Sequence, residues 1–305
     1  MKLTSVVYQS LLFIYRALPF RPFWARVIRG LPIDLERYYR DLHFNGVFTV
    51  KSDSGQFRIN HLGTTIENEL FWKGLDNSLE RDTMWIWKLL SLSSDTILDV
   101  GANTGVYSLV AKTENPKARV IAFEPSRKVY PELKRNIMLN SFEVKTEQIA
   151  LSNSNRTQVF YDLDWMEFPT SGSLSPAKEK NLRPGRTDIA EHEVQCSTLD
   201  HYLDEKKIGS VDLMKVDVEL HEPEVFEGFS NLQKFRPAIV IEVLTADVAR
   251  RIEEVADLTG YRYLMLIDTL RVREFDNLKA DPDHRNHLLL PEEHTLPANV
   301  IIESH

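Results

Sequence analysis

The sequence contains one cysteine, so no disulfide bond can form within the chain. This favours a reducing compartment, where structural disulfides are rare. Cys196 falls in a predicted strand, and we expect a buried, unreactive thiol rather than a nucleophile. Basic residues are in the minority as well, and the net charge is -8. This charge argues against a general nucleic-acid-binding protein, which needs a basic surface.

Long hydrophobic runs are also missing. Near the N-terminus, Gln9 and Arg16 interrupt the apolar residues before they reach the roughly 20 residues of a membrane-spanning helix. No small-residue cleavage site of the signal-peptide kind follows them. We therefore predict a cytoplasmic protein.

The first 33 residues nevertheless differ from the rest of the chain, because no acid precedes Asp34. The basic residues of this segment are Lys2, Arg16, Arg21, Arg26 and Arg29. Between them lie Val6, Val7, Leu11, Leu12, Phe13, Ile14, Phe20, Phe23 and Trp24. Two interpretations have equal weight: an amphipathic anchor at a membrane interface, or a helix that packs on the domain.

The most informative stretch is 96–108, where a strand, a glycine turn and a helix follow one another. Residues 97–100 read as a buried strand, 101–105 as a tight turn and 106–111 as the start of a helix. This order is the first unit of a doubly wound fold. Glycines in the turn let a ligand approach the backbone, and the free N–H groups of the helix start suit a negatively charged ligand group.

Strands and helices alternate after this unit. Further strands are predicted at 120–123, 144–151, 211–218, 238–243, 261–267 and 287–290, a short extra strand at 158–161, and helices at 66–90, 130–139, 222–235 and 246–259. The pattern predicts an α/β fold with a Rossmann-like, doubly wound, seven-stranded, mostly parallel sheet. One of the last two strands is expected to run antiparallel, because no clear helix separates them.

The predicted organisation is a domain at 61–305 after an N-terminal extension at 1–60. The extension is helical and ends in a hairpin at 47–59, which the turn residues 52–55 indicate. Within the domain, the polar stretch 169–192 reads as a long loop, and such loops are either functional or mobile.

The turn and the next strand end predict the ligand. A dinucleotide site would have the pattern Gly-x-Gly-x-x-Gly, whereas this turn has only Gly101 and Gly105, with Asn103 between them. Glu124, at the end of the second strand, is placed to accept hydrogen bonds from ribose hydroxyls, and Asp99 would suit a cationic amino group. A ligand with an ammonium, a carboxylate and a ribose matches S-adenosylmethionine better than NAD. Either acid alone could be an ordinary cap, but both beside a glycine turn favour a binding site.

The residues 99–105, Asp-Val-Gly-Ala-Asn-Thr-Gly, resemble the glycine motif of class I S-adenosylmethionine-dependent methyltransferases. More narrowly, the chain resembles the FkbM family over roughly residues 60–290. The residues that carry this resemblance are 215–222 (Lys-Val-Asp-Val-Glu-Leu-His-Glu) with Val225, Phe226 and Gly228, then 123–125, Asn136, Asn140, 198–200 and 237–243. The resemblance implies a methyltransferase that acts on a hydroxyl of a sugar, a glycan or a secondary metabolite. Leu220 departs from the family, which usually has glycine there, and this puts the acceptor pocket in doubt.

The fourth strand carries the candidate catalytic residues. Lys215, Asp217, Glu219 and, if the strand persists, His221 alternate onto one face, near the point where ligands bind in such sheets. Transfer to an alcohol needs alignment and a general base, so we expect Glu219 or His221 as the base and Asp217 as a positioning group. The alternatives are a buried Lys215–Asp217 ion pair and a surface His221 at a helix start. Glu242 and Glu80 are weaker pocket candidates, and we expect no metal.

Two other functions remain open from the sequence. Leu220 would suit a binding module that has kept the fold and lost the acceptor site, and tight NAD binding would favour an oxidoreductase. The expected partner is a small-molecule or glycan acceptor and no nucleic acid. The basic, aromatic N-terminus would suit peripheral contact with a membrane and an acceptor such as a lipid-linked glycan.

Overall fold

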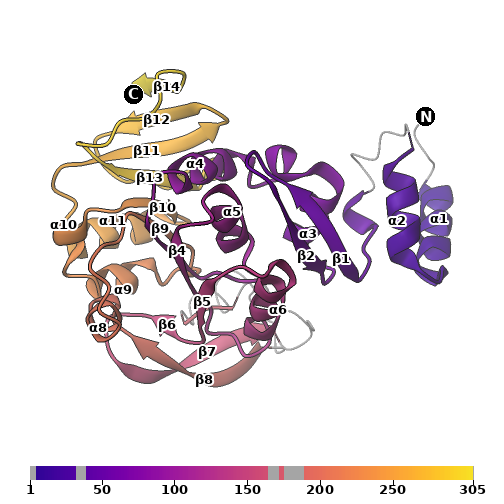
Figure 1. Ribbon diagram of the computed structural model, residues 1–305, viewed down its shortest axis with the longest axis horizontal. Coiled ribbons are helices and arrows are strands. Elements are labelled where there is room, and N and C mark those ends of the chain that lie inside the picture. The colour runs from indigo at the N-terminus through magenta and orange to yellow at the C-terminus, as the bar shows by residue number, and fades with distance from the viewer. Residues whose placement is uncertain (1–4, 32–38, 164–171, 175–188, 305) are drawn as a thin grey trace.

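The computed structural model describes residues 5–31, 39–163, 172–174 and 189–304, and a nine-stranded sheet lies at its centre (Figure 1). The strand order is β14-β12-β11-β13-β10-β9-β3-β4-β5. The bounds are β3 (Thr96–Val100), β4 (Arg119–Phe123), β5 (Val144–Glu147), β9 (Leu213–Val216), β10 (Ala238–Glu242), β11 (Tyr261–Asp268), β12 (Arg271–Phe275), β13 (Asn286–Pro291) and β14 (Ile301–Ser304). From β5 to β10 neighbouring strands are parallel, and β13 is antiparallel to both β10 and β11. The doubly wound, mostly parallel sheet is confirmed, and β12 and β14 extend its edge.

Side chains alternate along the buried strands and divide the core into two layers. Ile97 of β3 packs in one hydrophobic cluster and its neighbour Leu98 in the other. Helices α4 (Arg81–Ser91), α5 (Val106–Glu114) and α6 (Tyr130–Asn140) contribute to the first layer, and α8 (Leu199–Glu205), α9 (Glu222–Glu227), α10 (Leu232–Phe235) and α11 (Ala246–Val255) to the second. Because both faces are covered, the central strands are continuous apolar runs. The carboxyl ends of β3, β4, β9 and β10 meet at one edge, where such sheets bind ligands.

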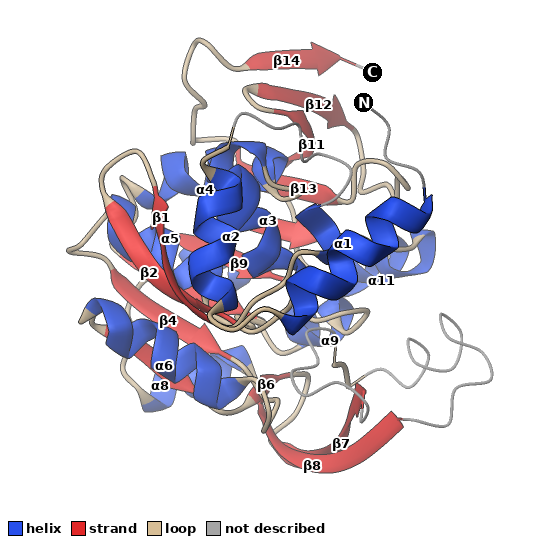
Figure 2. Cartoon of the chain, turned by 90° about the vertical axis from the view of Figure 1, so that its right-hand side faces the viewer, coloured by secondary structure: helices blue, strands red, loops and turns tan. Residues whose placement is uncertain are grey.

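The described residues of the N-terminal part form two helices, a 3-10 turn and a hairpin. Its elements are α1 (Ser5–Ala17), α2 (Arg21–Arg29), the 3-10 turn η1 (Tyr39–Asp41), β1 (Gly46–Lys51) and β2 (Gln56–His61). The predicted hairpin is confirmed, and β1 and β2 pair antiparallel. In Figure 1, α1 and α2 stand at the right-hand end beyond the hairpin, and in Figure 2 this side faces the viewer. Phe57 of β2 belongs to the same hydrophobic cluster as Leu109 of α5, whereas the division at residue 60 stays a prediction.

Several predicted elements are shorter than expected or divided. The helix at 66–90 is broken at Gly74, where φ is +80°, into α3 (Thr65–Lys73), η2 (Leu75–Asn77) and α4. The helix at 222–235 is likewise two helices, α9 and α10, and the helix at 246–259 ends at Val255. Within the described ranges, none of the helices combines the length and the apolar character that crossing a bilayer requires.

The third predicted strand, at 144–151, is also divided. Its first part is β5, and its last part, β6 (Ala150–Leu151), pairs in a separate sheet of order β6-β8-β7 with β7 (Arg156–Leu163) and β8 (Ile189–Ser197). Figure 2 shows β7 and β8 curving away below the central sheet. The predicted loop at 169–192 extends too far, because residues 189–192 belong to β8. Residues 169–171 and 175–188 lie outside the described residues. Cys196 of β8 is buried as predicted, and burial raises the pKa of its thiol to about 11.

Candidate active site

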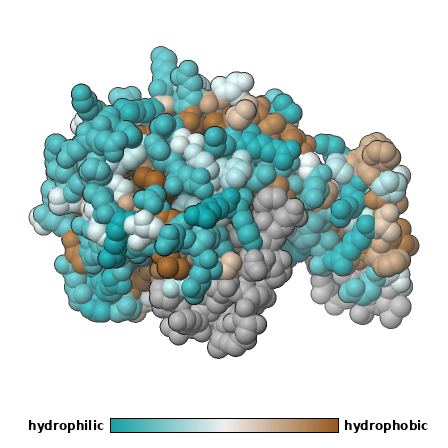
Figure 3. All heavy atoms as spheres, turned by 90° about the horizontal axis from the view of Figure 1, so that it is seen from below, coloured by the Kyte–Doolittle hydropathy of each residue, from teal (hydrophilic) through white to brown (hydrophobic). Residues whose placement is uncertain are grey.

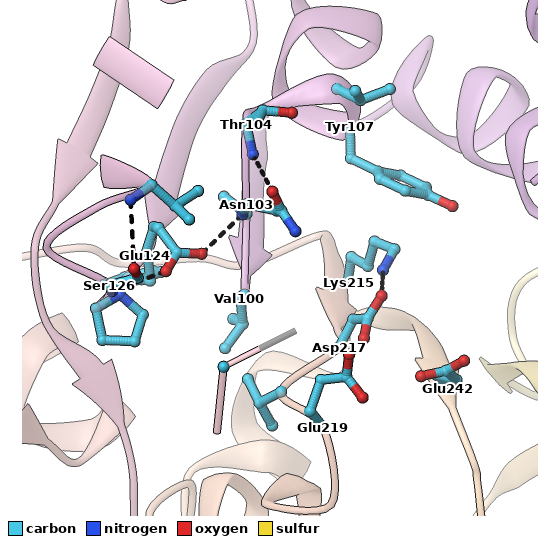
Figure 4. Close-up of a pocket in the computed structure, with 18 of the residues that line it drawn as sticks. Val100, Asn103, Thr104, Tyr107, Glu124, Ser126, Lys215, Asp217, Glu219 and Glu242 are labelled. Atoms are coloured by element: carbon cyan, nitrogen blue, oxygen red, sulfur yellow. Dashed lines mark hydrogen bonds and ion pairs between the residues drawn. The ribbon is translucent and has the colours of Figure 1, made fainter. Parts of the chain in front are cut away.

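A cavity of about 290 Å³ lies at the carboxyl ends of the central strands (Figure 4). Its walls include the turn after β3 (Gly101, Ala102, Asn103, Thr104), the residues after β4 (Glu124, Pro125, Ser126), those after β9 (Asp217, Val218, Glu219) and Glu242 at the end of β10. Thr65, Ile66 and Glu69 of α3 also line it. The topology therefore brings together residues that are far apart in the sequence, as the switch point of a doubly wound sheet does.

The glycine turn is needed for close contact between two strand ends. Gly101 has a φ of +81°, and a Cβ there would lie 1.9 Å from the carbonyl oxygen of Asp217. The Gly101 and Ala102 N–H groups donate to the Phe123 carbonyl at 3.0 and 2.9 Å. Gly105 is the N-cap residue of α5 and has a φ of +91°, and a Cβ there would lie 2.6 Å from Leu133 Cδ1. Gly101 thus borders the cavity, whereas Gly105 is a packing position outside its lining.

Glu124 forms a fixed acidic wall on one side of the cavity. Its Oε2 accepts from the Asn103 N–H at 2.9 Å, and its Oε1 accepts from the Ser126 N–H at 2.8 Å. Burial raises the pKa of this carboxyl to about 7, against the effect of these two hydrogen bonds. Each carboxylate oxygen can accept a second hydrogen bond, so the group remains able to receive hydroxyl donors. The predicted proximity of Asn103 and Glu124 is present.

Asp99 does not lie where the sequence interpretation placed it. Its side chain is 1 % exposed and is not part of the cavity lining. Its Oδ2 accepts from the Ser108 N–H at 2.9 Å and from the Ser108 hydroxyl at 2.7 Å. Burial raises the pKa of this carboxyl. The side chain therefore ties β3 to the first turns of α5, which is the capping alternative.

The end of β9 forms the opposite wall, and it is not an extended strand. The predicted strand at 211–218 spans only Leu213–Val216, so the expected alternation beyond Asp217 is wrong. Lys215 Nζ lies 2.6 Å from Asp217 Oδ2 and 4.3 Å from the centre of the Tyr107 ring. Burial lowers the pKa of Lys215, but the negative charge of Asp217 and of further acids outweighs it and raises the pKa above its ordinary value. The ion pair that the sequence offered as an alternative is present, and Asp217 lines the cavity as well.

The backbone turns sharply at Glu219 and Leu220. Both residues have a left-handed backbone conformation, with φ values of 57° and 72°. Glu219 lines the cavity, whereas Leu220 packs against the second hydrophobic cluster and is not part of the lining. The position at which the family usually has glycine is thus one where glycine is conformationally favoured. The side chain of Leu220 thus lies outside the cavity lining, and its effect on an acceptor stays a prediction.

His221 is the N-cap residue of α9 and is almost fully buried, not a surface residue. Its Nε2 lies 3.0 Å from the Ser152 hydroxyl, and its Nδ1 lies 3.5 Å from Glu224 Oε2. Burial lowers the pKa of this imidazole, partly offset by the charge of Glu224. His221 borders the cavity, but both ring nitrogens already face protein partners. This arrangement suits a positioning residue better than a general base.

Other acids and a tyrosine complete the site. Glu242, a weaker candidate in the sequence, lines the cavity, and burial raises its pKa to about 9. Glu80, the other weak candidate, also lines it and accepts from the Tyr107 hydroxyl at 2.8 Å. The sequence interpretation missed Tyr107, which lines the cavity, and Glu222, a buried acid of the stretch 215–222 that lies behind the lining. Among the residues that the structure describes, no group of three or more metal-ligating side chains is arranged to hold a metal ion.

Comparison with known proteins places this site in a family. A family model described as "Methyltransferase FkbM domain" matches residues 99–264. Methyltransferase sdnD of Sordaria araneosa is 32% identical over 160 residues, which are 45% of this chain and 61% of that protein. The 31-O-demethyl-FK506 methyltransferase FkbM of Streptomyces tacrolimicus is 27% identical, covering 57% of this chain and 74% of its own length. Hexuronic acid methyltransferase AglP of Haloferax volcanii is 25% identical, and the match covers 57% of this chain and 66% of that protein.

Proposed function

The chain belongs to the FkbM family of methyltransferases, and from this premise we propose that it methylates a hydroxyl oxygen of a sugar, a glycan or another small molecule. The observation that supports this proposal most directly is the cavity itself. One wall carries the glycine turn and Glu124, and the other carries Asp217, Glu219 and Glu242. The proposal places the nucleoside at the first wall and the acceptor at the second.

The turn side would hold S-adenosylmethionine. Glu124 would accept hydrogen bonds from the ribose hydroxyls, because the Asn103 and Ser126 N–H groups fix its carboxylate at the cavity wall. Gly101 leaves the backbone bare at the turn. Asp99 and Gly105 would act from outside the cavity, by fixing β3 and α5. The cofactor supplies a reactive methyl group, and the protein's task is to align the acceptor and remove its proton.

The acidic wall would act on the acceptor. We assign the general base to Glu219, which would take the proton of the acceptor hydroxyl as the oxygen gains its methyl group. Asp217, held by Lys215, would orient the acceptor, and His221 would hold the turn in place through Ser152 and Glu224. The names of two relatives, a 31-O-demethyl-FK506 methyltransferase and a hexuronic acid methyltransferase, favour a hydroxylated acceptor.

Calorimetry with purified protein tests the cofactor half of the proposal. We expect saturable binding of S-adenosylmethionine, lost in Gly101→Arg because that side chain has no room beside Asp217. Gly209→Arg is the matched control, since nothing lies within 4 Å of a Cβ at that position. If the unaltered protein shows no binding, the proposal fails.

A panel of hydroxylated acceptors with labelled S-adenosylmethionine tests the catalytic half. Methyl transfer that Glu219→Gln abolishes, with cofactor affinity retained, is the expected result. Cofactor binding without turnover on any acceptor would instead favour the alternative, a non-catalytic module that has kept the fold. The position of Leu220, outside the cavity lining, speaks against that alternative.

A further inference from the structure

The N-terminal helices carry an apolar surface that nothing in the described chain covers. Eight large hydrophobic side chains between residues 11 and 31 are exposed, against seven over the rest of the described residues. They are Leu11, Phe13, Ile14, Phe20, Phe23, Trp24, Val27 and Leu31, which we call the apolar face. Figure 3 shows apolar side chains gathered at the right-hand end of the molecule, over the described part of these helices. Patches of this kind are sites of interaction with proteins or membranes.

The exposed residues of α2 lie on one side of the helix. Phe23 and Val27 are four residues apart and Trp24 is adjacent to Phe23, so these three share a face, and the exposed Phe20 and Leu31 flank the helix at its two ends. The opposite side of α2 is used for folding, since Ala25 is fully buried and Ile28 packs in a small cluster with Leu12 and Tyr15 of α1.

The charge of the same segment identifies the occupant. No acidic residue precedes Asp34, whereas the chain as a whole has a net charge of -8. Arg26 and Arg29 of α2 and Arg58 of β2 line a shallow groove of about 540 Å³ with no acidic residue in its lining. In the described part of the chain, none of the three has a carboxylate partner within 4 Å.

We propose that α1 and α2 dock on an anionic lipid bilayer, with the apolar face in the interface and the Arg26–Arg29–Arg58 groove on lipid phosphate groups. A helix with aromatic and aliphatic residues on one side and arginines beside them binds a bilayer in this way. Each arginine near an anionic surface adds about 1 kcal/mol of attraction. The occupant is a bilayer and not a protein, because the exposed residues are aromatic and aliphatic and every charged residue within α1 and α2 is an arginine.

The docking surface is connected to the cavity through α3. The Arg29 guanidinium carbon lies 5.1 Å from the centre of the Phe71 ring of this helix. Trp72, the next residue, packs on the small cluster that contains Leu12 and Tyr15 of α1. The same helix carries Ile66 and Glu69 into the cavity wall. A bilayer at α1 and α2 would therefore stand at a fixed place relative to the cavity, so that acceptors attached to lipid could reach it.

Cosedimentation of the full chain with vesicles tests the proposal. Phosphatidylcholine vesicles with and without phosphatidylserine are compared at low and high salt. We expect binding that increases with phosphatidylserine and weakens with salt. The combined variant Phe20→Asn, Phe23→Gln, Val27→Gln should lower the partition coefficient at least about tenfold. Asparagine is chosen at residue 20 because φ is 56° there.

Two control variants separate the surface from a general effect. Leu92→Gln, Met138→Gln, Val255→Gln removes three exposed apolar side chains elsewhere and should bind as the unaltered chain does. Arg58→Gln should weaken binding to phosphatidylserine vesicles about fivefold, whereas Arg119→Gln, at another exposed position, should not. The proposal would be overturned if each control variant lost as much vesicle binding as the variant with which it is compared.

Two further outcomes would also overturn it. In the first, the unaltered chain stays in solution with both kinds of vesicle. In the second, it forms concentration-dependent dimers that the combined variant lacks, which would mean that a second copy covers the apolar face. S-adenosylmethionine binding is measured on the same preparations. If the protein binds the cofactor and not the vesicles, only the docking proposal is contradicted. If it binds the vesicles and not the cofactor, only the proposed function is contradicted.

Discussion

Replacing Gly101 by alanine should damage both stability and cofactor binding, for two separable reasons. Its φ of +81° costs an L-residue about 1–2 kcal/mol. The new Cβ would also lie 1.9 Å from the Asp217 carbonyl oxygen, which is backbone. The ends of β3 and β9 would have to separate by about 1 Å or more, and such overpacking costs a further 1–3 kcal/mol or so.

Two other glycines isolate these contributions. Gly63 has a φ of +90° with nothing within 4 Å of the place that a Cβ would take, so Gly63→Ala measures the backbone cost alone. Gly209 has open space and no positive φ, so Gly209→Ala should change the free energy of unfolding by less than about 0.5 kcal/mol. Urea denaturation of the three variants should rank them in the order Gly209, Gly63, Gly101 from least to most destabilised.

Calorimetry with S-adenosylhomocysteine supplies the functional readout. The affinity should fall at least about tenfold in Gly101→Ala, because the turn and the Asp217 wall shift together, and should be unchanged in the other two variants. The contrary result is a Gly101→Ala variant that unfolds at the same urea concentration as Gly63→Ala and binds S-adenosylhomocysteine as the unaltered protein does. That result would mean that the two strand ends are not held in close contact.

Further predictions concern Glu124 and Asp217 in the walls of the cavity and Leu220 behind them. Burial raises the pKa of the Glu124 carboxyl to about 7, so S-adenosylhomocysteine should bind more weakly as the pH falls through 7 and this carboxylate becomes neutral. Calorimetry at several pH values measures this, and in Glu124→Gln the affinity should depend less on pH. Because this pKa lies above the ordinary 4.5, the free energy of unfolding should fall as the pH rises between these values, and less so in Glu124→Gln. Asp217→Asn leaves the buried Lys215 unpaired and should lower the unfolding free energy by about 1–3 kcal/mol, which adding Lys215→Met should recover in urea denaturation without recovering turnover. Leu220→Gly relieves a φ of 72° at a residue outside the cavity, so turnover should stay within about twofold, and a large change in rate would show that Leu220 shapes the acceptor site.

The central sheet could be predicted because its strands are buried on both faces. Residues 97–100 and 238–243 are nearly continuous apolar runs, and each is followed by a helix pattern. Strands β12 and β14 could not be predicted, because most of their described side chains are exposed or half-buried. In β12 only Val272 is buried, and Arg273 instead pairs with Glu303 of β14 at 2.9 Å. A strand that depends on cross-strand ion pairs has little hydrophobic pattern of its own.

The site was predictable to the extent that strand ends determine it. Gly101, Glu124 and Asp217 follow neighbouring strands, and all three line the cavity. Asp99 was misplaced because the alternation of a strand gives the face of a side chain but not its partner. Its face is the one that α5 covers, and Ser108 lies there to donate two hydrogen bonds.

The turn at Glu219 and Leu220 lay beyond sequence reasoning because its support comes from farther along the chain. A carboxylate oxygen of Glu222 accepts from the Val218 N–H at 3.2 Å and from the Leu220 N–H at 3.3 Å. Two such bonds to a buried acid contribute about 1 kcal/mol each, which is comparable to the cost of leucine in a left-handed conformation. The chain can therefore accept leucine where the family usually has glycine. Glu222 places Glu219 at the cavity wall, and the proposed base depends on the first turn of α9 as much as on β9.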